Sequence, residues 1–203
     1  MLIAMDSQHL RRSQTERSAE MQGRLLQSAI DALIELGYAG TTVVEVCRRA
    51  EVTRGAFNHH YPSLYALLAQ TLHRLNGLFA QDFAIDSDSL ETLLGGALAA
   101  TRRREFKALI ELWLACRNDQ ALGEILYPII ESASAMFDPR AKGHDSALAD
   151  AAIQTYHLCF EAIIGLALGQ TVGRTDTRLA HRDAVESQIL ALARAAAAAA
   201  RRF

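Results

Sequence analysis

The sequence is short of proline and has no long apolar run. Only three prolines occur in 203 residues, while alanine and leucine are frequent, which favours helix over sheet. No run approaches the 18 apolar residues of a membrane helix, and the opening MLIAM is too short for the apolar part of a signal peptide. With 50% hydrophobic and 22% charged residues, the composition indicates a soluble globular protein. We expect it to be cytoplasmic, without a membrane partner.

Cysteine and the usual catalytic motifs are also scarce. Cys47, Cys116 and Cys159 have neither Cys-x-x-Cys nor metal-ligand spacing. We interpret them as buried structural thiols in a reducing compartment, with a redox-sensing cysteine as the alternative. The sequence has no Gly-rich phosphate loop, no HExxH, and no nucleophile that pairs with a histidine and an acid in a recognised motif. It therefore predicts neither an enzyme nor a bound metal or other cofactor.

Charge is nearly balanced, while helical periodicity covers most of the chain. A net charge of −2 provides no global field for nucleic acid, so any such binding must come from a local surface. Apolar spacing predicts a first helix over 16–36, ended by Gly37. Further helices are predicted over 90–101, 104–117, 120–138, 146–172 and 177–201. The fold class is therefore all-α.

The stretch TTVVEVCRRAEVTRGAFNHHYPSLYALL, residues 41–68, carries several helix start signals. Thr42 and Thr53 are N-caps of two short helices that end near residues 50 and 60, and Ser63 caps a longer fourth helix. A helix of about seven residues is unstable alone in water. Two such helices joined by a short turn form a helix-turn-helix, whose second helix enters the DNA major groove. A helical hairpin inside a bundle is the alternative.

The residue types in this stretch suit DNA binding. Val46, Ala50 and Phe57 can be buried, while Gly55 is small enough for close backbone approach to DNA. Thr42 lies at a helix N-terminus, where free N–H groups favour a phosphate. The side chains expected to face outward are those of Thr53, Arg54, Asn58 and His59.

Residues 20–70 resemble the DNA-binding signature of TetR-family transcriptional regulators. The resemblance rests on the Thr-Thr cap, the turn and the TRGAFNHHYPS segment. It implies a homodimeric, repressor-like protein that binds a palindromic operator in double-stranded DNA and responds to a small-molecule effector. It divides the chain into a DNA-binding domain, residues 1–80 with the first 15 as a flexible arm, and a ligand-binding and dimerisation domain, residues 81–203. The predicted DNA-binding residues are Thr42, Arg48, Thr53, Arg54, Gly55, Asn58, His59, His60 and Tyr61.

Three positions depart from the usual family pattern. Glu51 replaces a common turn glycine, so it is strained if its φ is positive. Asn58 replaces an aromatic residue and Leu64 replaces a lysine, both of which contact phosphates in the family. We expect weaker salt dependence of DNA binding, unless Arg48 and the arginines of the N-terminal arm compensate. A helical ligand-binding or interaction protein that has lost specific DNA binding is the alternative function.

The C-terminal half contains a candidate ligand pocket and a candidate dimer interface. Aromatic and apolar side chains with a few polar groups are typical of small-molecule sites. The pocket candidates are Phe106, Trp113, Tyr127, Met136, Tyr156, His157 and Phe160. The segment IQTYHLCFEAIIGLALGQ is apolar nearly all round, which predicts that a partner subunit buries one side. The interface candidates are Ile164, Gly165, Leu168, Gly169, Val185, Ile189 and Leu192.

The sequence also gives expectations for the spacing of the recognition helices and for the most basic run of residues. The dimer would place its two recognition helices about 34–36 Å apart, one turn of DNA, or a multiple of that distance. The most basic run, residues 102–104, is interpreted as a solvated corner rather than a second nucleic-acid patch.

Overall fold

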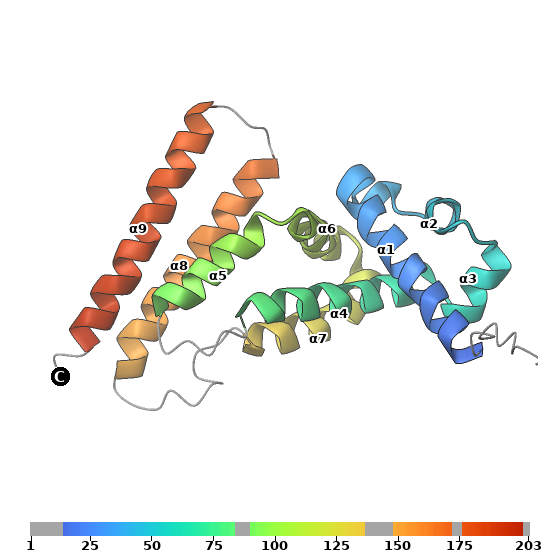
Figure 1. Cartoon of the computed structure of the whole chain (residues 1–203), viewed down its shortest axis with the longest axis horizontal. Coiled ribbons are helices and arrows are strands. Elements are labelled where there is room, and N and C mark those ends of the chain that lie inside the picture. Colours follow the sequence, from blue (N-terminus) through green and yellow to red (C-terminus); the bar gives the residue numbers. More distant parts are fainter. Residues whose placement is uncertain (1–13, 84–89, 137–147, 172–175, 201–203) are drawn as a thin grey trace, which may run out of the picture.

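The computed structural model describes residues 14–83, 90–136, 148–171 and 176–200. These residues fold into helices joined by short turns, with no strand among them, which confirms the all-α prediction (Figure 1). No helix in these four segments is long and apolar enough to cross a membrane. The helices are α1 (Gln14–Gly40), α2 (Val43–Ala50), α3 (Arg54–His60), α4 (Leu64–Phe83), α5 (Leu90–Thr101), α6 (Arg104–Asn118), α7 (Gln120–Met136), α8 (Leu148–Thr171) and α9 (Asp176–Ala200).

The N-terminal helices begin and end where the local signals predicted. Thr42 caps α2 and Thr53 caps α3, each through its side-chain oxygen, and Ser63 accepts a hydrogen bond from the Ala66 amide at 3.1 Å at the start of α4. Gly37 has φ 70°, as predicted for a terminating glycine. The chain then makes one further helical turn to Gly40, so α1 extends past the predicted end with a kink at Gly37.

A small hydrophobic cluster holds the first four helices together. It consists of Leu25, Ala29, Val46, Cys47, Ala50, Phe57, Tyr61 and Leu67. Five of these eight side chains come from the two short helices α2 and α3 or from the residue that follows α3. The short helices are therefore stabilised by packing on α1 and α4 rather than by their own propensity.

A larger cluster fills the space between α1 and α4–α9. The helices α1 and α4 contribute to both clusters, since Leu25 and Leu67 belong to the small one whereas Ile30 and Leu68 belong to the large one. Figure 1 shows α2 and α3 at one end of the molecule and α8 and α9 at the other. Helix α4 therefore connects the helix-turn-helix end to the rest of the bundle.

The three cysteines are buried and free, as predicted. Burial raises the pKa of each thiol above its ordinary value. Raised pKa values keep thiols protonated and unreactive, which agrees with a structural role.

Candidate functional site

The turn between α2 and α3 contains a strained residue. Glu51 ends α2 with φ 53° and ψ 47°, the left-handed conformation that non-glycine residues rarely adopt. Its amide donates to the Arg48 carbonyl at 3.3 Å, and the next amide, of Val52, donates to the Cys47 carbonyl at 3.0 Å. These bonds satisfy carbonyls that the end of α2 leaves free. The strain expected from the sequence at Glu51 is confirmed.

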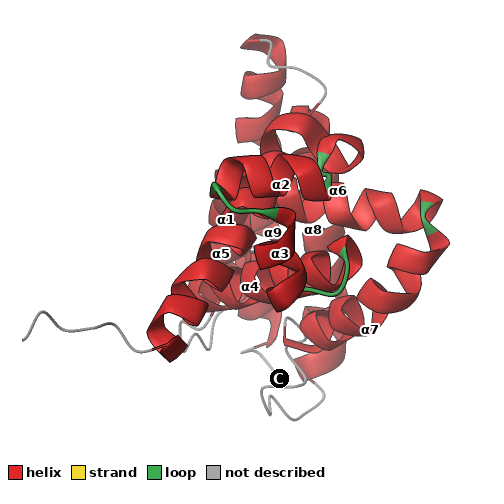
Figure 2. Cartoon of the chain, turned by 90° about the vertical axis from the view of Figure 1, so that its right-hand side faces the viewer, coloured by secondary structure: helices red, strands yellow, loops and turns green. Residues whose placement is uncertain are grey.

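The helix α3 is fixed by one buried side and exposes the other. Phe57 is 1% exposed, and its ring centroid lies 6.0 Å from that of Tyr61, which is 6% exposed. Arg54 and Asn58 are one helical turn apart on the exposed side (Figure 2, where α2 and α3 face the viewer). The exposed residues of this segment are Thr53, Arg54, Gly55, Asn58 and His59, while His60 is half-buried.

Nothing in the described part of the chain requires a glycine at position 55. A Cβ built on it would meet only the Thr53 hydroxyl oxygen at 3.7 Å, an ordinary contact, and its φ is not positive. Neither packing nor backbone conformation therefore requires glycine here. A partner that approaches the backbone of α3 closely would require it.

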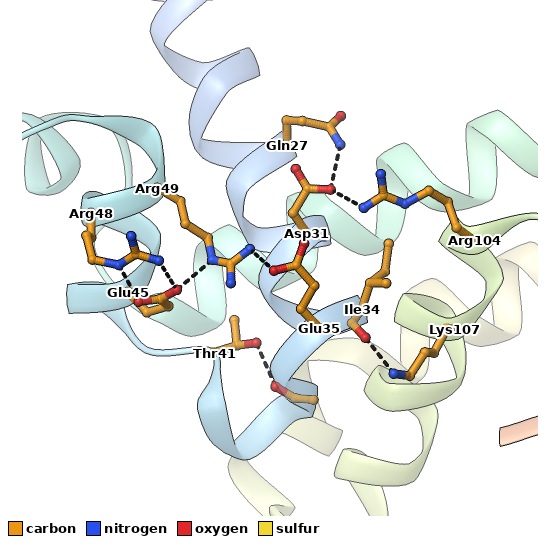
Figure 3. Close-up of polar contacts among 11 residues, drawn as sticks. Gln27, Asp31, Ile34, Glu35, Thr41, Glu45, Arg48, Arg49, Arg104 and Lys107 are labelled. Atoms are coloured by element: carbon orange, nitrogen blue, oxygen red, sulfur yellow. Dashed lines mark hydrogen bonds and ion pairs between the residues drawn. The ribbon is translucent and has the colours of Figure 1, made fainter. Parts of the chain in front are cut away.

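The predicted DNA contacts differ in how freely their side chains are presented. Thr42 is exposed, and its hydroxyl accepts from the Glu45 amide at 3.2 Å. Arg48 is exposed but donates two hydrogen bonds to Glu45, at 2.8 and 2.7 Å (Figure 3). Tyr61 is mainly a packing residue, and burial raises the pKa of its hydroxyl. Contact of these residues with DNA stays a prediction.

Glu45 organises the charges of α2. Arg49 donates to Glu45 at 2.6 Å and to Glu35 of α1 at 2.8 Å, so the network ties α2 to α1 (Figure 3). Hydrogen bonds from Arg48 and then Arg49 lower the pKa of Glu45 to about 2. In a capping box, a glutamate at this position would accept from the N-cap amide, but the carboxylate of Glu45 is occupied by Arg48 and Arg49.

Leu64 has a packing role in place of the phosphate-binding lysine of the family pattern. It is partly buried and packs against both hydrophobic clusters at the first turn of α4. A lysine there would have to leave this contact to reach a phosphate. Arg24, which the sequence reasoning missed, donates from Nη2 to the Ala50 carbonyl and joins α1 to the end of α2.

An apolar cavity of about 180 Å³ lies among α4–α8. Five of the seven predicted ligand-binding residues line it, namely Phe106, Trp113, Tyr156, His157 and Phe160. The Tyr156 and Phe160 rings stack with centroids 5.9 Å apart, and the Phe106 ring meets those of Phe79 and Trp113 edge-on. Polar groups that the sequence analysis did not select, Asn76, Thr101 and Glu161, also line it.

One predicted cavity residue lies elsewhere, and another has a side chain that the structure does not describe. Tyr127 is 50% exposed, and its hydroxyl donates to the Cys116 carbonyl at 3.2 Å, so it braces α7 against α6 outside the cavity. Met136 ends α7, and its side chain lies outside the described residues.

Comparison with known proteins decides the family. Residues 25–71 match the family model for bacterial regulatory proteins of the tetR family. An uncharacterised HTH-type transcriptional regulator of Mycobacterium bovis is 32% identical over 145 residues, which cover 68% of this chain and 71% of that protein. The chain belongs to the TetR family.

Other relatives agree with this assignment. The HTH-type transcriptional regulator CymR of Pseudomonas putida is 31% identical over 128 residues, which cover 60% of this chain and 63% of CymR. Among solved structures, Salmonella enterica GusR superposes with a TM-score of 0.60 at 16% identity, covering 90% of this chain and 98% of GusR. The multidrug binding protein EbrR, complexed with imidazole, gives a TM-score of 0.56 at 19% identity, covering 85% and 94% of the two chains. These structural likenesses concern the fold.

In this TetR-family chain, a carboxylate joins three helices near the helix-turn-helix. The hydroxyls of Tyr38 (α1) and Tyr65 (α4) donate to Oδ2 of Asp119 at 2.5 and 2.9 Å. The other oxygen of Asp119, between α6 and α7, accepts from the Leu122 amide at 3.0 Å. These hydrogen bonds, of which the one from Tyr38 has the largest effect, lower the pKa of the Asp119 carboxyl. Burial, and next the hydrogen bond to Asp119, raise the pKa of the Tyr38 hydroxyl.

A second junction joins α6 to α1. Arg104 pairs with Asp31 at 2.7 Å, and Lys107 donates to the Ile34 carbonyl at 2.5 Å (Figure 3). The DNA-binding end of the family fold is therefore attached to the bundle by polar contacts near both ends of α6.

The predicted dimer residues are divided between the exterior and the core. Gly165 and Gly169 are exposed with open space around them, and Leu192 is 49% exposed. Ile189 is only 3% exposed because it packs in the protomer's own core, so little of its side chain is available to a partner; its place in the interface stays a prediction. The remaining candidates, Ile164, Leu168 and Val185, are partly buried against the core. Leu158, which the sequence analysis missed, is 66% exposed on α8.

Proposed function

We propose that this TetR-family regulator is a ligand-responsive repressor that binds a palindromic operator as a homodimer and releases it when a small, largely apolar molecule enters the cavity. The proposal divides the chain near residue 80 into a DNA-binding domain and a ligand-binding and dimerisation domain. The exposed side of α8 and α9, with Leu158, Gly165, Gly169 and Leu192, is the proposed interface. An isologous dimer presents α3 twice, as a palindrome requires.

The observation that carries the proposal is the double role of α4. Its first turn packs on the cluster that seats α3 and bonds through Tyr65 to Asp119, while its last turns supply Asn76 and Phe79 to the cavity wall. A ligand that displaces this wall therefore acts on the same helix that positions α3. The effector would favour a dimer whose recognition helices have the wrong spacing for the operator.

The size of the cavity limits the effector. An apolar cavity of about 150 Å³ accommodates benzene, so about 180 Å³ suits a single ring with few additional atoms. Its aromatic walls favour a flat apolar molecule. Ethylbenzene and indole are therefore suitable probes.

The test combines DNA binding with cavity filling. Operator affinity would be measured by fluorescence anisotropy with and without each probe, in the intact protein and in Ala133→Phe, which fills the cavity from α7. We expect a probe to weaken operator binding about 5- to 150-fold in the intact protein and to have little effect in Ala133→Phe. Leu114→Phe, at a position 48% exposed and outside the cavity lining, is the control that keeps the response.

Two outcomes contradict the proposal. If probes bind but leave operator affinity unchanged, the coupling mechanism is wrong. If the protein binds probes but prefers no duplex sequence, it is instead a helical ligand-binding protein without specific DNA recognition. Asn58 and Leu64, in place of two phosphate-contacting residues of the family pattern, make this second experiment necessary.

A further inference from the structure

A basic groove lies at the corner between α5 and α6, where α8 and α9 also approach. Its volume is about 450 Å³. Its cationic lining residues are Arg102, Arg103, Arg104, Lys107 and Arg182. Arg102 and Arg104 are exposed, as expected for a solvated corner, and together with Arg182 they line a concave surface.

Two arginines in the groove share one buried carboxylate. Arg102 Nη2 donates to Glu186 Oε2 at 2.5 Å, and Arg182 Nε donates to Glu186 Oε1 at 2.5 Å. Glu186 is only 8% exposed. The side chains of Arg182 and Glu186 are 12% and 11% exposed, whereas that of Arg102 is 57% exposed. The Arg182 charge is therefore the one that is largely removed from water, where an uncompensated charge is costly.

One donor of this triad has no partner. Arg182 Nη2 is buried and makes no hydrogen bond with any residue that the structure describes. A buried guanidinium N–H without an acceptor is unfavourable and rare in folded proteins, so this donor is available to an acceptor other than the described residues.

The other three cations of the groove have different partners. Arg104 pairs with Asp31, and Arg103 lies 3.9 Å from Glu105. Lys107 donates to a backbone carbonyl, which does not neutralise its charge. The groove therefore brings five cationic side chains together, with Asp31, Glu105 and Glu186 as their carboxylate partners in the described part of the chain.

We propose that this groove binds a small oxyanion, a phosphate or carboxylate group, with Arg182 Nη2 as a donor to it. Guanidinium groups recognise such oxyanions through paired N–H donors. The groove adjoins the apolar cavity, because Thr101 and Phe106 line both. The proposal does not depend on the regulatory function, since it concerns binding to the free protein.

The test titrates the purified full chain with sodium phosphate and, separately, with sodium acetate. Ionic strength is held constant with sodium chloride, and the NMR signal of the Arg182 Nε–H group is followed. We expect at least one of the two anions to shift this signal saturably. Saturation by phosphate alone, by acetate alone or by both identifies which oxyanion the groove accepts. The absence of saturation with both anions overturns the proposal and leaves the Arg182 donor to another acceptor, such as a carboxylate of a second subunit.

Matched variants distinguish binding in this groove from general binding of anions to the protein surface. Binding to each variant is followed by its thermal unfolding midpoint at increasing anion concentration, because the Arg182 NMR signal is absent from Arg182→Gln. Arg182→Gln should weaken anion binding about tenfold, from the loss of a charged hydrogen bond. Glu186→Gln should strengthen it, because the negative charge of the triad is removed. Arg194→Gln, an α9 arginine paired with Glu91 at 3.1 Å, is the control and should leave it unchanged.

Two results with the variants contradict the proposal. Equal effects of Arg182→Gln and Arg194→Gln would mean that the anion binds the surface generally. If Arg182→Gln does not fold, Lys107→Gln replaces it and should weaken binding more than Arg194→Gln does. If Lys107→Gln instead leaves anion binding unchanged but weakens binding to duplex DNA in anion-free buffer, the groove is a DNA contact and the proposal is wrong.

Discussion

Replacement of Glu51 by glycine should stabilise the protein. Glu51 holds φ 53° and ψ 47° in the turn between α2 and α3 and is exposed. The left-handed conformation costs a non-glycine residue roughly 1–2 kcal/mol. Glycine removes this cost but gives the unfolded chain more freedom, worth about 0.5–1 kcal/mol. We therefore expect Glu51→Gly to raise the free energy of unfolding by about 0.5–1 kcal/mol.

The assay is urea and thermal unfolding at a fixed protein concentration, because an obligate dimer would have a concentration-dependent midpoint. For a chain of this size the expected rise in Tm is about 2 °C. Glu51→Ala, which keeps a Cβ in the same conformation, should show no gain, and Glu51→Asn should fall between the two. Equal stability of the glycine and alanine variants would refute the assigned turn geometry.

Three further predictions concern the DNA-binding end and its junction. Arg54→Gln should weaken operator binding about tenfold or more without changing stability, measured by anisotropy alongside thermal unfolding. Asp119→Asn removes the charged acceptor of the Tyr38 and Tyr65 hydroxyls. We expect this change to alter the ratio of operator affinities with and without effector several-fold. An unchanged ratio would exclude this junction from the coupling. The pKa of Glu45 in the folded protein is about 2, below its ordinary value of 4.5. The ion pairs of Glu45 therefore stabilise the protein fully above pH 4.5, and this stabilisation is lost as the pH falls towards 2. The unfolding midpoint of Glu45→Gln should be less sensitive to acid over that range.

Local signals explain why the N-terminal helices could be predicted closely. The caps Thr42, Thr53 and Ser63 act within three residues of their own position, so the sequence contains the whole interaction. The same holds for Gly37, whose positive φ needs only the absence of a Cβ. The burial of Phe57 follows from helical periodicity once the start of α3 is known. These elements depend little on the rest of the chain.

Contacts between distant segments could not be predicted in the same way. Asp119 lies 81 residues from Tyr38 and 54 from Tyr65, and no spacing rule brings these three residues together. The shared carboxylate of Glu186 is likewise 84 residues from Arg102. Such pairings depend on how whole helices pack.

The assignment of helix faces failed where a helix is apolar on more than one side. Ile189 fits the helical spacing of an interface, yet the protomer's own core buries it. Tyr127 fits an aromatic pocket segment, yet it is half-exposed because its hydroxyl is bonded to the Cys116 carbonyl. Hydrophobicity alone cannot distinguish a face that meets the core from one that meets a partner.

The central claim is that the exposed side of α3 reads DNA twice in each dimer, and selection from random duplexes tests it most directly. The ligand-free protein would be incubated with a random duplex library at low salt, and the bound fraction sequenced over successive rounds. We expect enrichment of an inverted repeat, with Asn58→Ala altering the preferred bases within each half-site. Bound duplexes no different in sequence from the starting library would contradict the claim.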